Sequence, residues 1–408
     1  MNLYKKTTIQ ALADEIIQEK LTANFEKHFG YPAECLFSVP GRSELGGNHT
    51  DHQNGHVLAC AVTLYIRAAA AKNGTDKVRI YSEGFGLTEL SVTDLDRREE
   101  EKNTTIALVR GILSFFKGLG AELSGFDVYA YSEVPAGSGL SSSAAFEVLI
   151  AKITDTFFHD EQLDPVILAK IGQYAENTYF GKPCGLMDQT ACAVGGVIGI
   201  NFFEGTPEVE KTEVNLSAYG YRLYIVETGG GHEDLTDEYA AIPNDMSSVA
   251  RFFKEKHLSR VDELDFFDNI TSLRERFSDR AVLRAFHFFE EDKRAVQELH
   301  ALKNGSWDLF LNLVNASGRS SFMYLQNVIP AGSVKSQPVA VALKAAEYAL
   351  HGRGAYRVHG GGFAGTIQAF VPEEEAAHFE ESMEHVIGQN CCRSLSVDND
   401  GCSALWLS

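Results

Sequence analysis

The sequence predicts an α+β protein. Apolar runs typical of strands and segments with helical periodicity are interleaved along the chain, without the regular βαβ rhythm of a doubly wound sheet. The composition is 44% hydrophobic and 23% charged, as in ordinary globular proteins. With 408 residues, and about 150 residues per domain, two or three domains are expected.

The first predicted element is an amphipathic helix. Leu12, Ile16, Ile17, Leu21 and Phe25 recur at helical spacing. Charges lie throughout the first 20 residues, so no apolar segment of a secretory signal is expected there. Acidic residues within the segment favour a packed helix over a targeting helix.

Further elements follow in chain order, each from its own apolar pattern. Residues 232–325 hold many charges, few glycines and mostly helix-like periodicity, and the last 60 or so residues return to strand and helix around residues 359–372. We place a domain boundary near residue 205, with an N-terminal domain of residues 1–205 and a C-terminal domain of residues 206–408. The predicted strands are 56–71, 126–134, 194–203 and 221–228, and the predicted helices are 144–158 and 166–180.

The charge balance excludes some classes of partner. The net charge is −20, so non-specific binding to nucleic-acid backbones, which depends on Lys and Arg, is not expected. No apolar run approaches the roughly 18 residues that span a bilayer. The seven cysteines have no zinc-like spacing and are expected to be reduced thiols in a cytoplasmic protein. We expect a monomer.

The first cluster with chemical potential is PGRSELGGNHTDHQNGHV, residues 40–57. Four glycines allow tight turns, and many donors and acceptors lie between them. Such a glycine-hinged loop can bind a polyol, whose hydroxyls each need a donor and an acceptor. A solvated loop is the alternative interpretation, and a metal site made by His49, Asp51 and His52 is another.

Two more glycine-rich clusters follow. In residues 135–149, PAGSGLSSSAAFEVL, glycines and serines run into a helical pattern, which predicts an anion site at a helix N-terminus. No Gly-Lys-Ser follows, so this is not a Walker loop. In residues 359–366, HGGGFAGT, successive glycines between two apparent strands predict a tight hairpin or a backbone that closes over a ligand.

Together these clusters resemble the GHMP kinase superfamily and, within it, the galactokinase family. The match covers roughly residues 36–372. Its four parts are the signature G-R-x-x-x-x-G-E-H-T-D-Y at residues 41–52, the phosphate loop P-x-G-x-G-L-S-S-S-A at residues 135–144, the segment P-C-G-I-M-D-Q at residues 183–189, and the motif G-G-G-F-G-G at residues 360–365.

The resemblance implies a two-lobed fold, with an N-terminal lobe like the second domain of a small-subunit ribosomal protein and a ferredoxin-like C-terminal lobe. It also implies transfer of the γ-phosphoryl group of ATP to the anomeric hydroxyl of galactose, with Mg²⁺ as cofactor. The implied catalytic residues are Asp188, as base or electrostatic partner, and Arg42; the nucleotide residues are Pro135, Gly137, Ser138, Gly139, Leu140, Ser141, Ser142 and Ser143; the metal residues are Ser143 and Glu176; and the sugar residues are Asn48, His49, Asp51, Gly185 and Tyr239.

Several positions depart from the family pattern. The Glu before the His is Asn48, the Tyr after the Asp is His52, and Ala364 replaces a glycine. The run from His49 to Gln53 also resembles plant galacturonokinases, so galacturonate is an alternative substrate. A non-catalytic galactose sensor is a third possibility, but such sensors lack the Ser-Ala pair that this chain has at residues 143–144.

Overall fold

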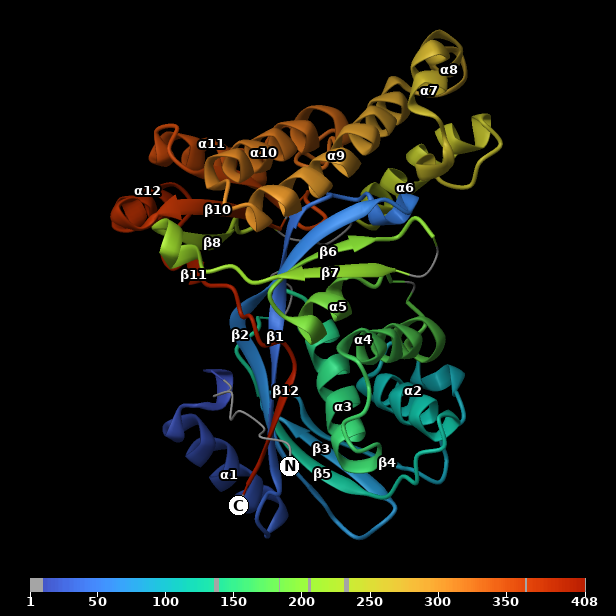
Figure 1. Ribbon diagram of the computed structural model, residues 1–408, viewed down its shortest axis with the longest axis vertical. Coiled ribbons are helices and arrows are strands. Elements are labelled where there is room, and N and C mark those ends of the chain that lie inside the picture. Colours follow the sequence, from blue (N-terminus) through green and yellow to red (C-terminus); the bar gives the residue numbers. More distant parts are fainter. Residues whose placement is uncertain are drawn as a thin grey trace.

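The computed structural model describes residues 10–135, 139–182, 184–204, 207–230, 235–363 and 365–407. Two sheets organise these residues, one in the lower and one in the upper half of Figure 1. Among the described residues, no helix is both long enough and apolar enough to cross a membrane. The mixed α+β architecture confirms the predicted fold class.

The larger sheet has the order β12-β1-β2-β5-β3-β4, with β6 paired to β2 and β7 paired to β6. All of these pairs are antiparallel except that of β3 with β5. The long strand β2 pairs with β6 along its first part and with β5 along its second. Its strands are β1 (Cys35–Gly46), β2 (His56–Lys72), β3 (Lys77–Ser82), β4 (Gly86–Ser91), β5 (Phe126–Ser132), β6 (Val197–Asn201), β7 (Glu208–Thr212) and β12 (Ser403–Trp406).

Helices cover both faces of this sheet (Figure 1). Side chains alternate between the faces of a strand, so Leu36 and Ala69 pack with one set of helical residues while Phe37 and Ala68 pack with another. The first face meets α1 (Glu15–Phe29), and the second meets α2 (Thr105–Gly118), α3 (Ser142–Phe158), α4 (Pro165–Tyr174) with its π-helical continuation η4 (Ala175–Phe180), and α5 (Met187–Val194).

The smaller sheet is antiparallel, in the order β11-β8-β10-β9. Helices α11 and α12 pack with it in one core cluster, and α6 and α9 share another. Figure 1 shows α7 and α8 projecting from this half of the molecule. The elements are β8 (Tyr221–Glu227), α6 (Thr236–Phe252), α7 (Glu263–Asp268), α8 (Ile270–Arg276), α9 (Asp279–Lys303), α10 (Trp307–Ser320), α11 (Pro338–Leu350), β9 (Ala355–His359), β10 (Thr366–Pro372), α12 (Ala376–Val386) and β11 (Cys392–Leu395).

The end of β1 joins the two halves. The Arg357 guanidinium on β9 donates to the Glu44 carboxylate at 2.9 Å and to the carbonyl of Leu45 at 2.7 Å, and the Gln368 amide on β10 donates to the carbonyl of Glu44 at 3.0 Å. All three polar side chains are buried. The residues that follow β1 are therefore held at the junction of the lobes.

One sequence expectation is wrong. We expected residues 40–57 to form a loop, but residues 35–46 form β1, with irregular pairing between Pro40 and Gly41. Strand pairing to β2 tolerates the glycines because the register shifts where they lie. The predicted boundary near residue 205 stays a prediction; among the described strands, the change of sheet comes between β7 and β8.

Candidate functional site

An ion pair between Arg42 and Asp188 forms the centre of the site. Arg42, on β1, donates from Nε to Oδ1 of Asp188 at 2.7 Å and from Nη2 to Oδ2 at 2.8 Å. Asp188 lies in the first turn of α5, so two distant motifs meet here. Bidentate pairing of this kind fixes both side chains in plane. The Asp188 side chain still keeps 35% of its surface exposed, whereas that of Arg42 keeps 9%.

The phosphate-loop motif contacts the same pair. Ser141 donates its hydroxyl to Asp188 Oδ2 at 2.5 Å, and the carbonyl of Gly139 accepts from Arg42 Nη1, also at 2.5 Å. Ser141 has a φ of 57°, an uncommon conformation for a residue with a side chain, and it is the N-cap of α3. The N-terminus of a 17-residue helix, with its unpaired N–H groups, therefore lies beside the ion pair.

Electrostatics keep Asp188 ionised. Burial by itself raises its pKa, but the charge of Arg42, together with the hydrogen bonds from Arg42 and Ser141, lowers the pKa of Asp188 below its usual value. A carboxylate that is charged at neutral pH and partly exposed can accept a proton or a hydrogen bond from a ligand hydroxyl.

The first and third motifs meet on the other side of the site. The Asn48 amide donates to the carbonyl of Gly360 at 2.7 Å, and His49 Nε2 lies 3.2 Å from the carbonyl of Gly361, to which it donates. Burial and the nearby His52 lower the pKa of His49 to about 3, so its imidazole is neutral at physiological pH. Here the hairpin predicted for the third motif connects β9 to β10.

Asp51, Gly185 and Tyr239 lie around this junction. A Cβ on Gly185 would come within 3.0 Å of Asp51 Oδ2, so the carboxylate lies against the backbone of the Asp188 segment. Tyr239, on α6, donates its hydroxyl to the carbonyl of Gly362 at 3.0 Å. The structure thus brings together residues that the sequence separates by more than 120 positions.

Helix α9 holds the turn after β1. Glu291 accepts from the backbone N–H groups of Gly47 and Asn48 at 3.2 and 3.4 Å, and from the Ser317 hydroxyl at 2.5 Å. His287 Nε2 donates to the carbonyl of Asn48 at 2.9 Å. Both side chains are fully buried, so α9 fixes the backbone from which His49 and Asp51 extend.

The candidate metal residues offer hard oxygen atoms. Glu176, on η4, has one carboxylate oxygen bonded to the Gln189 amide at 3.1 Å, while the other lies 3.6 Å from the Lys182 ammonium. Ser143 is exposed in the first turn of α3. The Glu176 oxygen that pairs with the exposed Lys182 and the Ser143 hydroxyl are oxygen donors of the kind that fits Mg²⁺, which keeps several water ligands. Within the described part of the chain no three His, Cys, Asp or Glu side chains form a metal cluster, so nothing supports the alternative of His49, Asp51 and His52 as a metal site.

Comparison with known proteins agrees with this geometry. The GHMP kinase N-terminal domain matches residues 107–196, and the galactokinase galactose-binding signature matches residues 23–72. A galactokinase of Ligilactobacillus salivarius is 31% identical over 381 residues, which are 91% of this chain and 93% of that protein. One from Actinobacillus pleuropneumoniae is 30% identical over 364 residues, 88% and 91% of the two chains. This chain belongs to the galactokinase family.

Solved structures agree with membership of the galactokinase family. The galactokinase of Lactococcus lactis, solved in complex with galactose, superposes with a TM-score of 0.80 at 25% identity, covering 95% of this chain and 100% of that one. A mevalonate kinase matches with a TM-score of 0.63 at 15% identity, covering 90% and 99% of the two chains, which shows the shared fold alone. The two-lobed kinase fold implied by the sequence motifs is confirmed.

The structure brings together most of the predicted site residues of this galactokinase-family chain. Ser142 is the first residue of α3, and Leu140, two residues before it, is fully buried, its carbonyl accepting from the backbone N–H of Arg42 at 3.2 Å. Pro135 follows β5 by three residues. Gly137, Ser138, Pro183 and Ala364 lie outside the described residues. The individual roles assigned to these residues stay predictions.

Three polar residues near the site were missed by sequence reasoning. Glu291 and Arg357 gave no signal, because a single charged residue in a helix or strand is usually exposed. Glu147 did give one: it is the only charged residue in the apolar run 144–151 before Lys152.

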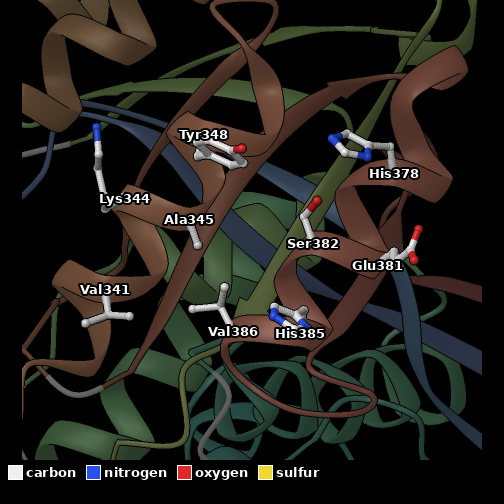
Figure 2. Close-up of a pocket in the computed structure, with 9 residues that line it drawn as sticks. All are labelled: Val341, Lys344, Ala345, Tyr348, His378, Glu381, Ser382, His385 and Val386. Atoms are coloured by element: carbon white, nitrogen blue, oxygen red, sulfur yellow. The ribbon is translucent and has the colours of Figure 1, made fainter.

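A separate groove lies between α11 and α12, on the outer side of the second lobe (Figure 2). Its volume is about 670 Å³, and none of its lining residues belongs to the four motifs. The lining residues are Val341, Lys344, Ala345, Tyr348, His378, Glu381, Ser382, His385 and Val386. We therefore assign the chemistry to the Arg42–Asp188 region instead.

Proposed function

We propose that this chain transfers the γ-phosphoryl group of ATP to the anomeric hydroxyl of galactose, giving galactose 1-phosphate and ADP. The observation that carries the proposal is the bidentate Arg42–Asp188 pair beside the N-terminus of α3. It supplies a hydroxyl acceptor and a fixed cation next to an anion site. Phosphoryl transfer needs mainly this kind of positioning and charge stabilisation.

Asp188 accepts the hydrogen bond of the anomeric hydroxyl and takes its proton as the new oxygen–phosphorus bond forms. The bond from the γ-phosphorus to its bridging oxygen breaks, and ADP leaves with the electron pair. Arg42 holds Asp188 in orientation through two hydrogen bonds and offsets negative charge as the phosphoryl group moves. Because the pKa of Asp188 is low, proton transfer is late in this reaction.

The N-terminal end of α3 and the loop before it bind the β- and γ-phosphates through backbone N–H groups and serine hydroxyls. Mg²⁺ neutralises phosphate charge when bound. Ser143 and Glu176 would hold it, because they offer a hydroxyl and a carboxylate oxygen whose only ion pair among the described residues is with the exposed Lys182. Together with Arg42, these few placed cations and dipoles allow a protein of net charge −20 to bind a polyanion.

His49, Asp51, Gly185 and Tyr239 bind the sugar hydroxyls in this proposal. Asn48 has a different role, because its side chain is already hydrogen-bonded within the protein. Its amide nitrogen donates to Glu44 and to Gly360, and its oxygen accepts from Ser321 and from Asn327 at 3.2 and 2.8 Å. The side chain is fully buried, so we assign it to the support of the sugar site. A direct contact to the 6-hydroxyl, which the family Glu makes, is then absent.

Galacturonate is therefore the second candidate substrate. A carboxylate at position 48 would repel the 6-carboxylate of a uronic acid, and the buried Asn48 amide does not.

For the chain as a whole, we propose a domain boundary between residues 205 and 206. We also propose a cytoplasmic monomer that binds neither nucleic acid nor membrane. All seven cysteines are free thiols, which fits a reducing compartment.

A coupled assay of ADP formation across galactose, galacturonate, N-acetylgalactosamine and arabinose tests the proposal. We expect the highest kcat/KM with galactose. Turnover of galacturonate alone would show that galacturonate, and not galactose, is the substrate. Tight binding of ATP and galactose without formation of any sugar phosphate would identify a non-catalytic sensor.

A further inference from the structure

Two buried carboxylates face a single amide behind the site. Glu147, on α3, and Glu176, on η4, each accept a hydrogen bond from Nε2 of Gln189, at 3.0 and 3.1 Å. Glu147 is fully buried, and Gln189 and Glu176 keep only 1% and 5% of their surface exposed. The group lies directly behind the ion pair because Gln189 follows Asp188 in α5.

Stability alone does not account for Glu147. Burying a carboxylate is costly unless its oxygens are hydrogen-bonded, and Glu147 Oε1 has no partner among the described residues. Gly172 closes the space on one side, since a Cβ there would come within 3.2 Å of Glu147 Oε2. The neighbouring positions 144–145 and 148–151 are apolar, and an apolar residue would fit the helix equally well.

The arrangement does account for the orientation of Glu176. An amide nitrogen has two N–H groups, and here the Glu147 and Glu176 carboxylates are the two close acceptors, while the Cys184 sulfur lies farther from the same nitrogen, at 3.6 Å. With one N–H held by Glu147, the plane of the Gln189 amide is fixed, and so is the direction of the second N–H. Glu176 Oε2 is therefore fixed, which leaves Oε1 turned toward the exposed Lys182 ammonium at 3.6 Å, the side from which a cation would approach.

We propose that Glu147 is a positioning residue of the phosphoryl-transfer site, which acts through the Gln189 amide to orient Glu176 as a metal ligand. The inference rests on the proposed function in one respect: it takes the cation at Glu176 to be that of the nucleotide complex. Residues that orient a metal ligand from behind typically change metal affinity by about 10- to 100-fold when they are replaced.

Two substitutions at position 147 test the inference. Glu147→Gln keeps an oxygen that can accept the N–H of Gln189, whereas Glu147→Leu removes the acceptor at similar volume. We expect Glu147→Leu to bind the Mn²⁺ complex of a non-hydrolysable ATP analogue about 10-fold more weakly, and Glu147→Gln to retain close to wild-type affinity. Electron paramagnetic resonance of Mn²⁺ gives the affinity without turnover, and thermal unfolding without ligand monitors the fold.

Glu298 provides the matched control. It is also a fully buried glutamate, with neither carboxylate oxygen partnered among the described residues, but it lies on α9. Glu298→Leu should leave Mn²⁺·nucleotide affinity unchanged. If Glu147→Leu does not fold, Gln189→Met removes the same link from its other end and should weaken Mn²⁺ binding equally.

Wild-type Mn²⁺·nucleotide affinity in folded Glu147→Leu or Gln189→Met would overturn the inference, as would equal loss in Glu147→Gln and Glu147→Leu. The double variant provides a further check, since two residues of one link should not weaken binding more than either alone. Metal–nucleotide binding without galactose turnover in the wild type would overturn the proposed function and leave the inference intact. No metal-dependent nucleotide binding in the wild type would overturn the inference.

Discussion

Asp188 combines three interactions that together define its chemistry. Arg42 fixes both of its oxygens, Ser141 donates to one of them, and the side chain keeps a third of its surface open. The ion pair lowers its pKa, so Asp188 is charged throughout the physiological range. A charged and oriented acceptor suits a reaction in which the hydroxyl becomes acidic only as phosphorus approaches it.

Asp188→Asn should reduce kcat by about 1,000-fold, because an amide cannot take the proton and turns an N–H group toward Arg42. Nucleotide affinity should stay within a few-fold of wild type, since the phosphates are bound by the loop and α3. Steady-state kinetics and calorimetric titration of the nucleotide analogue measure both quantities. Turnover near the wild-type rate would remove Asp188 from the mechanism.

The Glu291 carboxylate should stabilise the folded protein in a pH-dependent way. Although burial works in the opposite direction, the electrostatic interaction with His287 and the charges of Arg294 and Arg357 lower the pKa of Glu291 to about 2. A carboxylate with a lowered pKa in the folded state stabilises the protein above its unfolded pKa of about 4.3. That contribution is lost as the pH falls from about 4.3 toward 2.

Glu291→Gln should therefore be less stable than wild type by about 2–3 kcal/mol at pH 7. The difference should shrink as the pH falls below 4, because wild type then loses what the variant already lacks. Denaturant unfolding at several pH values measures this. A difference that does not change between pH 7 and pH 3 would contradict the assigned ionisation.

Single residues also show what sequence reasoning could reach. Arg42 and Asp188 were identifiable because each belongs to a motif of fixed spacing. Glu291 was not, because its role comes from contact with Gly47 and Asn48, more than 240 positions away. Such long-range pairs leave no local pattern, so only the fold reveals them.

At the scale of elements, local periodicity predicted the strands and helices that form from long apolar runs. Strands β5, β6 and β8 lie within the predicted runs, β2 extends one residue beyond its run, and α3 begins at Ser142, where the serines give way to apolar residues. The end of β1 was missed because its glycines indicate a turn, and pairing to β2 overrides that preference. Arg42 therefore lies on a paired strand rather than in a loop.

The turn that follows β1 depends on Gly47. Its φ is 78°, and a Cβ there would come within 2.4 Å of the carbonyl oxygen of His56. Gly47→Ala should therefore destabilise the protein by more than the ~1–2 kcal/mol of a left-handed backbone alone, and it should weaken sugar binding. The control is Gly84→Ala, with a φ of 84° and no atom within 4 Å of its Cβ, which should cost only the backbone term. Equal shifts in Tm for the two variants would contradict this account.

At the scale of the whole molecule, the proposed sugar site depends on contact between the lobes. The first motif extends from the larger sheet, while the hairpin that it meets belongs to the smaller one. Sequence order could not show this, because the motifs are separated by about 300 residues. The buried Glu44–Arg357 pair lies at the same junction, where β1 meets β9.

The Glu44–Arg357 pair should make the stability of the protein depend on pH. Burial raises the pKa of Glu44 to about 7 even though Arg357 opposes the rise. A carboxyl whose folded pKa is raised costs stability as the pH rises from its unfolded value, about 4.3, through 7. Arg357→Met should raise the pKa of Glu44 further and so extend that cost to higher pH. The variant should be destabilised by about 3–5 kcal/mol at pH 8, where wild-type Glu44 is charged and paired, and by less at pH 5, where it is already neutral. Chemical unfolding at both pH values measures the difference in stability. A loss of stability that is as large at pH 5 as at pH 8 would show that packing of the Arg357 side chain, rather than its charge pairing with Glu44, holds the lobes together.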